Sequence, residues 1–223
     1  GYPNRNARRT LVRVRIGKRG LKMTPEIFAL CVSAALLELD TTYAFQLTLS
    51  RGIIAGPLLS LWTGDLMAGI QVGVFTELLF SDVNPLGGIL PPSAVVCSAV
   101  TLALHAMGIE LYFAFFFGVV GAIAFSMAEK FMRKNRFKWL IFWERRVMQQ
   151  PGQINHAILS AIANAFLSTF ILIFLFTWLC GKGFVWLLPF IPAQAHFACR
   201  FAYMAVPWIG LATLVPAFRL KTR

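Results

Sequence analysis

Apolar residues in this chain form long unbroken runs, and charged residues gather in short stretches between them. A helix that crosses a bilayer needs about 20 mostly apolar residues. The runs 83–109 and 147–181 are each long enough for a full crossing, and 111–128, slightly extended, makes another. The pattern therefore predicts membrane-spanning helices. Further charge-free runs cover 27–37, 52–64, 66–76, 183–199 and 201–218.

Two of the shorter runs meet at Gly64-Asp65 and are too short to cross a membrane alone. Irregular backbone at membrane depth is tolerated only where protein or a wet cavity covers it, so this break predicts half-helices or a re-entrant hairpin. GIIAG at 52–56 and GIQVG at 69–73 both have GxxxG spacing, which lets helix backbones approach closely. We therefore expect tight helix packing around the break.

Composition and charge agree with a membrane protein. Of the 223 residues, 58% are hydrophobic and 13% are charged, against about 45–50% and about 25% in soluble domains. The net charge of +12 comes from basic clusters beside apolar runs, with eight basic residues before Met23 and seven between Lys130 and Arg146. Such clusters mark cytoplasmic ends. We therefore expect an all-α, polytopic integral membrane bundle with broken or re-entrant helices, and no nucleic-acid partner.

The chain divides into a basic leader, residues 1–22, and a single membrane domain, residues 23–223. Met23 directly precedes the first apolar run, so we expect a native start there and a non-native leader. A signal peptide is the alternative, because a basic region precedes an apolar run. Residues 129–150 mix aromatic and aliphatic residues with blocks of Lys and Arg, which predicts an amphipathic segment at the cytoplasmic interface.

Six acidic residues lie within or beside the apolar runs, although a charge at the bilayer centre costs about 2.5–3.5 kcal/mol on insertion scales. Arg51 is the only basic residue between Met23 and Glu129, so ion pairs cannot account for all six acids. Some must lie near the interface, be protonated, or face water or a polar ligand. The six are Glu38, Asp40, Asp65, Glu77, Asp82 and Glu110.

Glu77 is the strongest candidate for a ligand or a polar cavity, because no base lies within a helical turn of it. Asp40 and Asp65 have helix capping as the alternative. For Glu110 the alternative is an interfacial turn.

No motif for catalysis, a metal, a cofactor or a nucleotide is visible in the sequence. The four cysteines stand far apart in apolar runs, and we expect them to be buried hydrophobes. His105, His156 and His196 are isolated and lack metal spacing, so we expect packed or interfacial histidines. No glycine-rich phosphate loop is present.

Residues 44–93 resemble the membrane enzyme IIC component of mannose/fructose/sorbose-type phosphotransferase systems. The motif pieces occur in the family's order over about 50 residues. Two positions depart from it, since Gly52 stands where the family usually has Pro and Ser93 where it usually has Asp. The matches are Phe45-Gln46, Ser50-Arg51, Gly64-Asp65, Gly69, Gly73, Glu77, Gly87-Gly88 and Pro91-Pro92.

The resemblance implies a multi-pass subunit of the bacterial inner (plasma) membrane. It would bind and translocate a hexose for phosphorylation by a cytoplasmic enzyme IIB, with enzymes IIA and IID as further partners, and homo-oligomers within the complex. The chain itself would carry no phosphoryl group, catalytic residue, cofactor or metal.

A carboxylate accepts hydrogen bonds from sugar hydroxyls, and amide side chains both donate and accept. We therefore expect Glu77 to bind the substrate, with Gln46, Asp65 and Asn84 nearby. The expected loop-shaping residues are Gly87, Gly88, Pro91 and Pro92, since glycine permits close backbone approach and proline stiffens the chain.

Two alternative functions stay open at this point. Gly52, Ser93 and an early end of the chain relative to the family favour a non-transporting or degenerate membrane partner subunit. A small-solute transporter that is not coupled to phosphorylation is the other.

Overall fold

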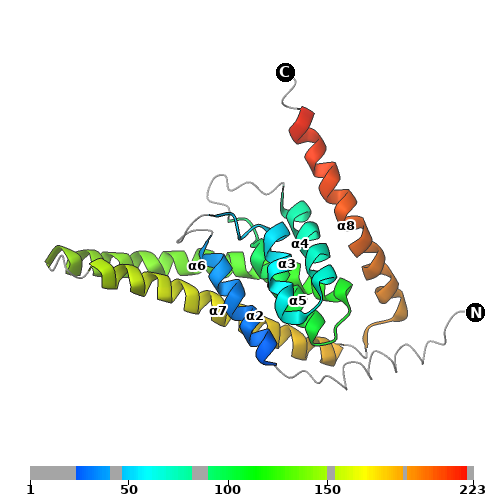
Figure 1. The fold of residues 1–223 in the computed structure, drawn as a ribbon, viewed down its shortest axis with the longest axis horizontal. Helices are drawn as coiled ribbons and strands as arrows, with labels where there is room; N and C mark the ends of the chain where they lie inside the picture. The colour runs from blue at the N-terminus through cyan, green and yellow to red at the C-terminus, as the bar shows by residue number, and fades with distance from the viewer. Residues whose placement is uncertain (1–23, 41–46, 82–89, 150–153, 188–189, 220–223) are drawn as a thin grey trace, which may run out of the picture.

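The computed structural model describes residues 24–40, 47–81, 90–149, 154–187 and 190–219. These residues form helices joined by turns, which confirms the expected all-α architecture. A bundle surrounds α5, and the last turns of α8 project away from it (Figure 1). The helices are α2 (Pro25–Leu39), α3 (Gly52–Thr63), α4 (Leu66–Phe80), α5 (Ala94–Ala106), α6 (Leu111–Gln149), α7 (Ile154–Leu187) and α8 (Ala193–Arg219).

Helices α3 and α4 form an antiparallel hairpin with its turn at Gly64-Asp65. Gly64 has a φ of 72°, in the left-handed region that glycine adopts without strain. The helices have 12 and 15 residues, or about 18 and 22 Å, against a hydrocarbon core of about 30 Å. The predicted break into two short helices is therefore confirmed, and their re-entrant position in a membrane stays a prediction.

The two GxxxG motifs face each other across this hairpin. A Cβ atom added to Gly56 would overlap the Gly69 carbonyl oxygen and the Gly73 Cα atom. One added to Gly73 would overlap the Gly52 carbonyl oxygen, and one added to Gly69 would overlap the Ser60 side chain. Only residues without a side chain allow backbones this close. The expected tight packing is confirmed.

Helix α5 lies at the centre of the bundle and packs against α2, α3, α4, α6 and α7. Every residue from Val95 to Leu104 is buried. The helix has only 13 residues. The sequence predicted that the run 83–109 could form one full crossing. That prediction is wrong for residues 90–109, the part of the run that the structure describes.

The start of α5 explains this short length. Pro91 and Pro92 lie just before the helix. Proline cannot donate a backbone hydrogen bond, and it disfavours the helical conformation in the residue that precedes it. The helix therefore does not extend further toward the N-terminus. Ser93 is the N-cap, and its Oγ accepts a hydrogen bond from the Val96 N–H at 3.2 Å. The apolar run is therefore interrupted by backbone chemistry rather than by charge.

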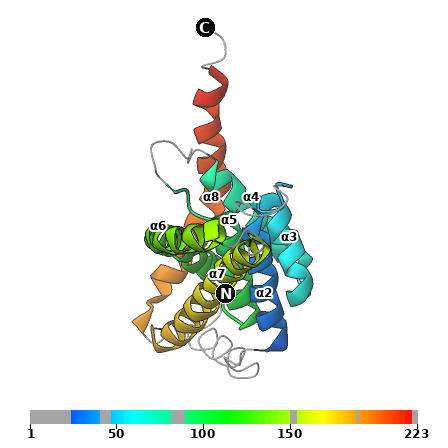
Figure 2. The same cartoon turned by 90° about the vertical axis from the view of Figure 1, so that its left-hand side faces the viewer.

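Helices α6 and α7 have 39 and 34 residues, or about 58 and 51 Å. Their distal parts extend from the bundle as a paired arm (Figures 1 and 2). Within the described residues, Leu111–Arg133 and Ile154–Phe184 are long and apolar enough to cross a membrane. The predicted interfacial segment continues α6 without a break as far as Gln149, and its location at the membrane stays a prediction.

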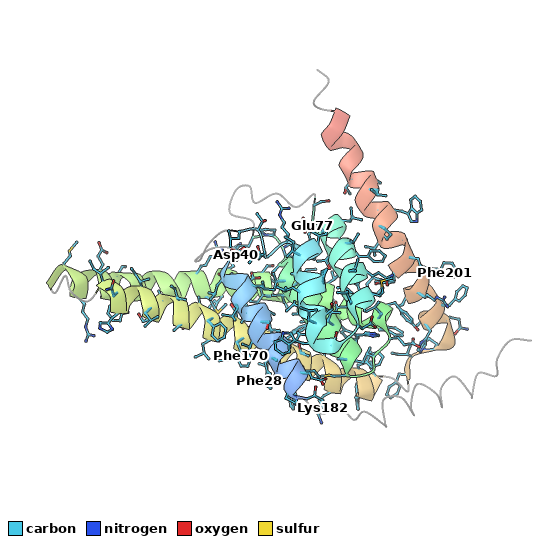
Figure 3. All side chains as sticks on the ribbon, viewed as in Figure 1. Phe28, Asp40, Glu77, Phe170, Lys182 and Phe201 are labelled. Carbon is cyan, nitrogen blue, oxygen red and sulfur yellow. The ribbon has the colours of Figure 1, made fainter. Side chains whose placement is uncertain are left out.

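Aromatic contacts join the outer helices to the bundle. Phe28 of α2 packs edge-on against Phe170 of α7, with ring centroids 5.3 Å apart (Figure 3). Tyr203 of α8 lies 4.8 Å from the Phe75 ring of α4 and 5.2 Å from the Phe115 ring of α6. These contacts leave the opposite faces of α7 and α8 uncovered.

The uncovered faces of α7 and α8 carry large apolar side chains. Leu159 is 65% exposed and Trp208 is 73% exposed, and Leu167, Leu175 and Phe201 are also exposed. Large apolar side chains exposed along both helices fit an interaction with a membrane or another protein. It is the surface expected of helices that contact lipid.

Replacing Gly56 with alanine is expected to destabilise the protein by about 1–3 kcal/mol, because the added methyl group has no space between α3 and α4. The midpoint of unfolding in detergent measures this change.

Gly183→Ala in α7 is the matched control, because a Cβ there meets no atom within 4 Å. Alanine is favoured over glycine in a helix by about 0.5–1 kcal/mol, so the control is expected to keep or raise stability. A Gly56→Ala protein as stable as the control would contradict the close packing.

Candidate functional site

Glu77 lies in the last turn of α4, and its carboxylate binds the start of α3. Its Oε1 accepts a hydrogen bond from Arg51 Nη1 at 2.9 Å, and its Oε2 accepts one from the Gly52 N–H at 2.8 Å. Helix N-termini have unpaired N–H groups and favour a negative charge, which Glu77 supplies. The Arg51 side chain is 65% exposed and that of Glu77 is 26% exposed, so the pair remains accessible.

The sequence showed no basic residue within a helical turn of Glu77, and this is true only of its own helix. Arg51 stands 26 positions earlier in the chain. The packing of Gly52 against Gly73, one turn before Glu77, brings the two side chains together. The paired GxxxG motifs were the sequence signal for this contact.

Asp40 lies at the same end of the bundle, as the C-cap of α2 (Figure 3). It is 6% exposed. Its Oδ1 accepts a hydrogen bond from the Leu47 N–H, and its Oδ2 accepts one from the Leu49 N–H, both at 2.9 Å. Asp40 thus binds the backbone that leads into α3, a role that the sequence did not indicate.

Glu38 and Ser93 form a third polar contact at this end. The Ser93 Oγ–H donates to Glu38 Oε2 at 2.6 Å. An aspartate at position 93 would instead place a second carboxylate against Glu38, and like charges disfavour each other. Ser93 therefore suits this chain, although it departs from the family pattern. Glu38, Asp40 and Glu77 all approach the loop end where α2 and α4 finish and α3 and α5 begin.

Asp65 lies at the opposite end of α4, as its N-cap. Its Oδ1 accepts a hydrogen bond from the Ala68 N–H at 3.0 Å, and its Oδ2 lies 3.4 Å from His105 Nε2. Twelve positions separate Asp65 from Glu77, or about 18 Å along the helix. The structure therefore does not bring these two predicted substrate-binding residues together.

Two histidines face carboxylates at the end of the bundle where Asp65 lies. His105 faces Asp65, and its Nδ1 lies 3.0 Å from the Ile109 carbonyl oxygen. His196 Nδ1 lies 3.5 Å from Glu110 Oε2 and 3.2 Å from the Tyr112 hydroxyl. The sequence did not indicate either pair, because the paired residues are distant in the chain and share no motif.

Four predicted site residues lie outside the described residues. They are Gln46, Asn84, Gly87 and Gly88. Pro91 and Pro92 are described and are half-buried in the non-helical stretch before α5. Among the described side chains, no three His, Cys, Asp or Glu residues gather in a way that could hold a metal ion.

A groove of about 630 Å³ lies between α2 and α3, and leucines and Trp62 form most of its lining. Its polar groups are Ser33 and Asp40. Ser33 Oγ accepts a hydrogen bond from Trp62 Nε1 at 2.9 Å, and both Asp40 oxygens bind backbone N–H groups. This lining offers few polar groups to a polar ligand, so the exposed Arg51–Glu77 pair is the better candidate site.

Short glycine-packed helices, long apolar helices and uncovered apolar faces define the chain as an all-α membrane protein. The family model of the phosphotransferase system (PTS) sorbose-specific IIC component matches residues 25–221, so the chain belongs to this family. It is 33% identical over 78 residues to the "Putative N-acetylgalactosamine permease IIC component 2" of Escherichia coli (strain K12). That similarity covers 35% of this chain and 58% of the relative.

Asp65 tests capping against sugar binding. Asp65→Ala is expected to lower stability by about 0.5–2 kcal/mol, because it removes the acceptor for the Ala68 N–H. Asp65→Asn is expected to retain most of this stability, since asparagine is an equally favoured N-cap. Unfolding midpoints in detergent and sugar uptake in cells are the measurements. An Asp65→Asn protein of normal stability that takes up no sugar would contradict a role limited to capping.

Proposed function

We propose that this chain is the IIC subunit of a sugar phosphotransferase complex. It binds a hexose within a bacterial inner membrane, which it crosses several times, and passes the sugar to a cytoplasmic enzyme IIB for phosphorylation. The match of the family model over residues 25–221 is the observation that carries this proposal. An N-acetylated amino sugar is the first substrate to test, given the name of the relative.

The Arg51–Glu77 pair supplies chemistry that suits an uncharged polyol. Sugar hydroxyls both donate and accept hydrogen bonds. The Glu77 carboxylate has about four acceptor positions, of which Arg51 and Gly52 occupy two. The Arg51 guanidinium has five N–H donors, and one of them binds Glu77. Charge-assisted hydrogen bonds contribute about 1.5–3 kcal/mol each. Several such bonds would let the pair bind a sugar in competition with water.

The other residues that we propose for the site lie close to Arg51 or Glu77 in the sequence. Gln46 and Asn84 would add amide groups that donate and accept. Gly87, Gly88, Pro91 and Pro92 would shape the loop before α5. Asp65 we now assign to capping of α4, because it lies at the far end of that helix.

The proposed partners follow from the same family. A membrane enzyme IID would complete the translocation unit, cytoplasmic enzymes IIA and IIB would deliver the phosphoryl group, and further copies of the chain would assemble within the complex.

A non-transporting partner subunit is the second candidate, and one contact favours it. Both Glu77 oxygens already bind groups of this chain, and the Gly52 N–H is one of them. A proline at position 52, usual in the family, could not make that bond. In this alternative, Glu77 holds the α3–α4 hairpin together and binds no sugar.

Glu77→Gln is expected to reduce sugar uptake by about a hundredfold or more, because it weakens the hydrogen bonds to Arg51 and to the sugar. The protein should reach the membrane in normal amounts. Uptake is measured in cells that supply the IIA, IIB and IID partners, with phosphoenolpyruvate-dependent phosphorylation in vesicles as a second readout.

Glu26→Gln is the control for this experiment, since it removes an exposed carboxylate in the first turn of α2. Normal uptake by Glu77→Gln would contradict a sugar-binding role for Glu77. No uptake by the unsubstituted protein, with all candidate sugars tested and the partners supplied, would favour the non-transporting subunit. Uptake that needs no phosphoenolpyruvate would instead indicate an uncoupled transporter.

A further inference from the structure

Two carboxylates hold the short segment that leads into α3, and they come from different helices. Asp40 of α2 binds the N–H groups of Leu47 and Leu49. Glu77 of α4 binds the Arg51 guanidinium and the Gly52 N–H. Four hydrogen bonds within six residues therefore fix this segment between α2 and α4.

The turn inside this segment has a demanding geometry. Thr48 has a φ of 62°, in the left-handed region that β-branched residues rarely adopt. The Arg51 N–H donates to the Thr48 carbonyl oxygen at 3.1 Å and closes the turn. Such a conformation persists only where surrounding contacts determine it. The two Asp40 bonds flank Thr48 directly and supply that constraint.

Asp40 is unsuited to bind a sugar itself. It is 6% exposed, and each of its oxygens accepts a backbone hydrogen bond at 2.9 Å. The accessible charged side chain of the segment is that of Arg51, three residues after the strained Thr48. Asp40 therefore acts on the backbone and reaches the exposed pair through it.

We infer that Asp40 is a positioning residue of the sugar site: it fixes the Thr48–Arg51 turn through Leu47 and Leu49 and so sets Arg51 and Gly52 against Glu77. This inference rests on the proposed function. When the Asp40 carboxylate is replaced, the turn relaxes, Arg51 moves away from Glu77, and the sugar-binding pair is no longer held in place.

Asp40→Asn tests this role, because the amide keeps the size but presents one acceptor and one donor to two N–H groups. In cells that supply the partner subunits, the KM for uptake is expected to rise by about tenfold, the equivalent of one hydrogen bond. The amount of protein in the membrane should stay normal. Asp40→Glu keeps both acceptors and is expected to recover part of the affinity.

Hydrogen exchange of the Gly52 amide gives a readout that a local structural role would not move. The first N–H groups of a helix have no acceptor within the helix, so Glu77 protects this amide. Measured on the full chain in lipid nanodiscs and resolved to single amides, Gly52 is expected to exchange about tenfold faster in Asp40→Asn. Glu26→Gln, on the same helix, should match the unsubstituted protein in uptake and exchange.

A raised KM together with faster Gly52 exchange supports the inference. An unchanged KM or a fully protected Gly52 amide in Asp40→Asn overturns it. If both Asp40 variants fail to reach the membrane while Glu26→Gln does, Asp40 is a folding residue and the inference is also overturned. If the unsubstituted protein takes up no sugar, the proposed function fails, and Gly52 exchange still decides whether Asp40 positions the segment.

Discussion

The close packing of α3 on α4 is the constraint on which the candidate site depends. Glycines at 52, 56 and 73 let the backbones of the two helices meet directly, and Gly69 leaves room for the Ser60 side chain. This contact fixes the register of the hairpin and places the start of α3 beside the last turn of α4. A wider spacing would separate Arg51 and the Gly52 N–H from Glu77, whose two hydrogen bonds are 2.9 and 2.8 Å long.

Short helices inside a bundle explain why so apolar a chain keeps carboxylates. Each helix that begins within the bundle leaves its first backbone N–H groups without partners in the helix. Burying these N–H groups unpaired is unfavourable. Glu77 serves the start of α3, Asp65 serves the start of α4, and Asp40 serves the segment before α3. Three of the six acids therefore satisfy backbone groups, and one of the three, Glu77, also forms the exposed pair with Arg51 that makes up the candidate site.

The two departures from the family pattern each match a contact of this chain. Gly52 donates its N–H to Glu77 and lies close to the Gly73 carbonyl oxygen, which a larger residue would displace. Ser93 caps α5 and donates a hydrogen bond to Glu38, whereas an aspartate at position 93 would repel the Glu38 carboxylate. Neither position is therefore a defect of the fold, and both change which groups surround the candidate site.

The sequence by itself determined the helical membrane class, the family and the break at Gly64-Asp65, because apolar run length, charge clusters and GxxxG spacing are local properties. It did not reveal the short α5, since proline and a serine cap interrupted a run that charge counting left intact. Only the tertiary structure paired Glu77 with Arg51, separated it from Asp65 and gave Asp40 its two backbone partners. Those relations depend on helix packing between residues distant in the chain, and no spacing along one helix encodes them.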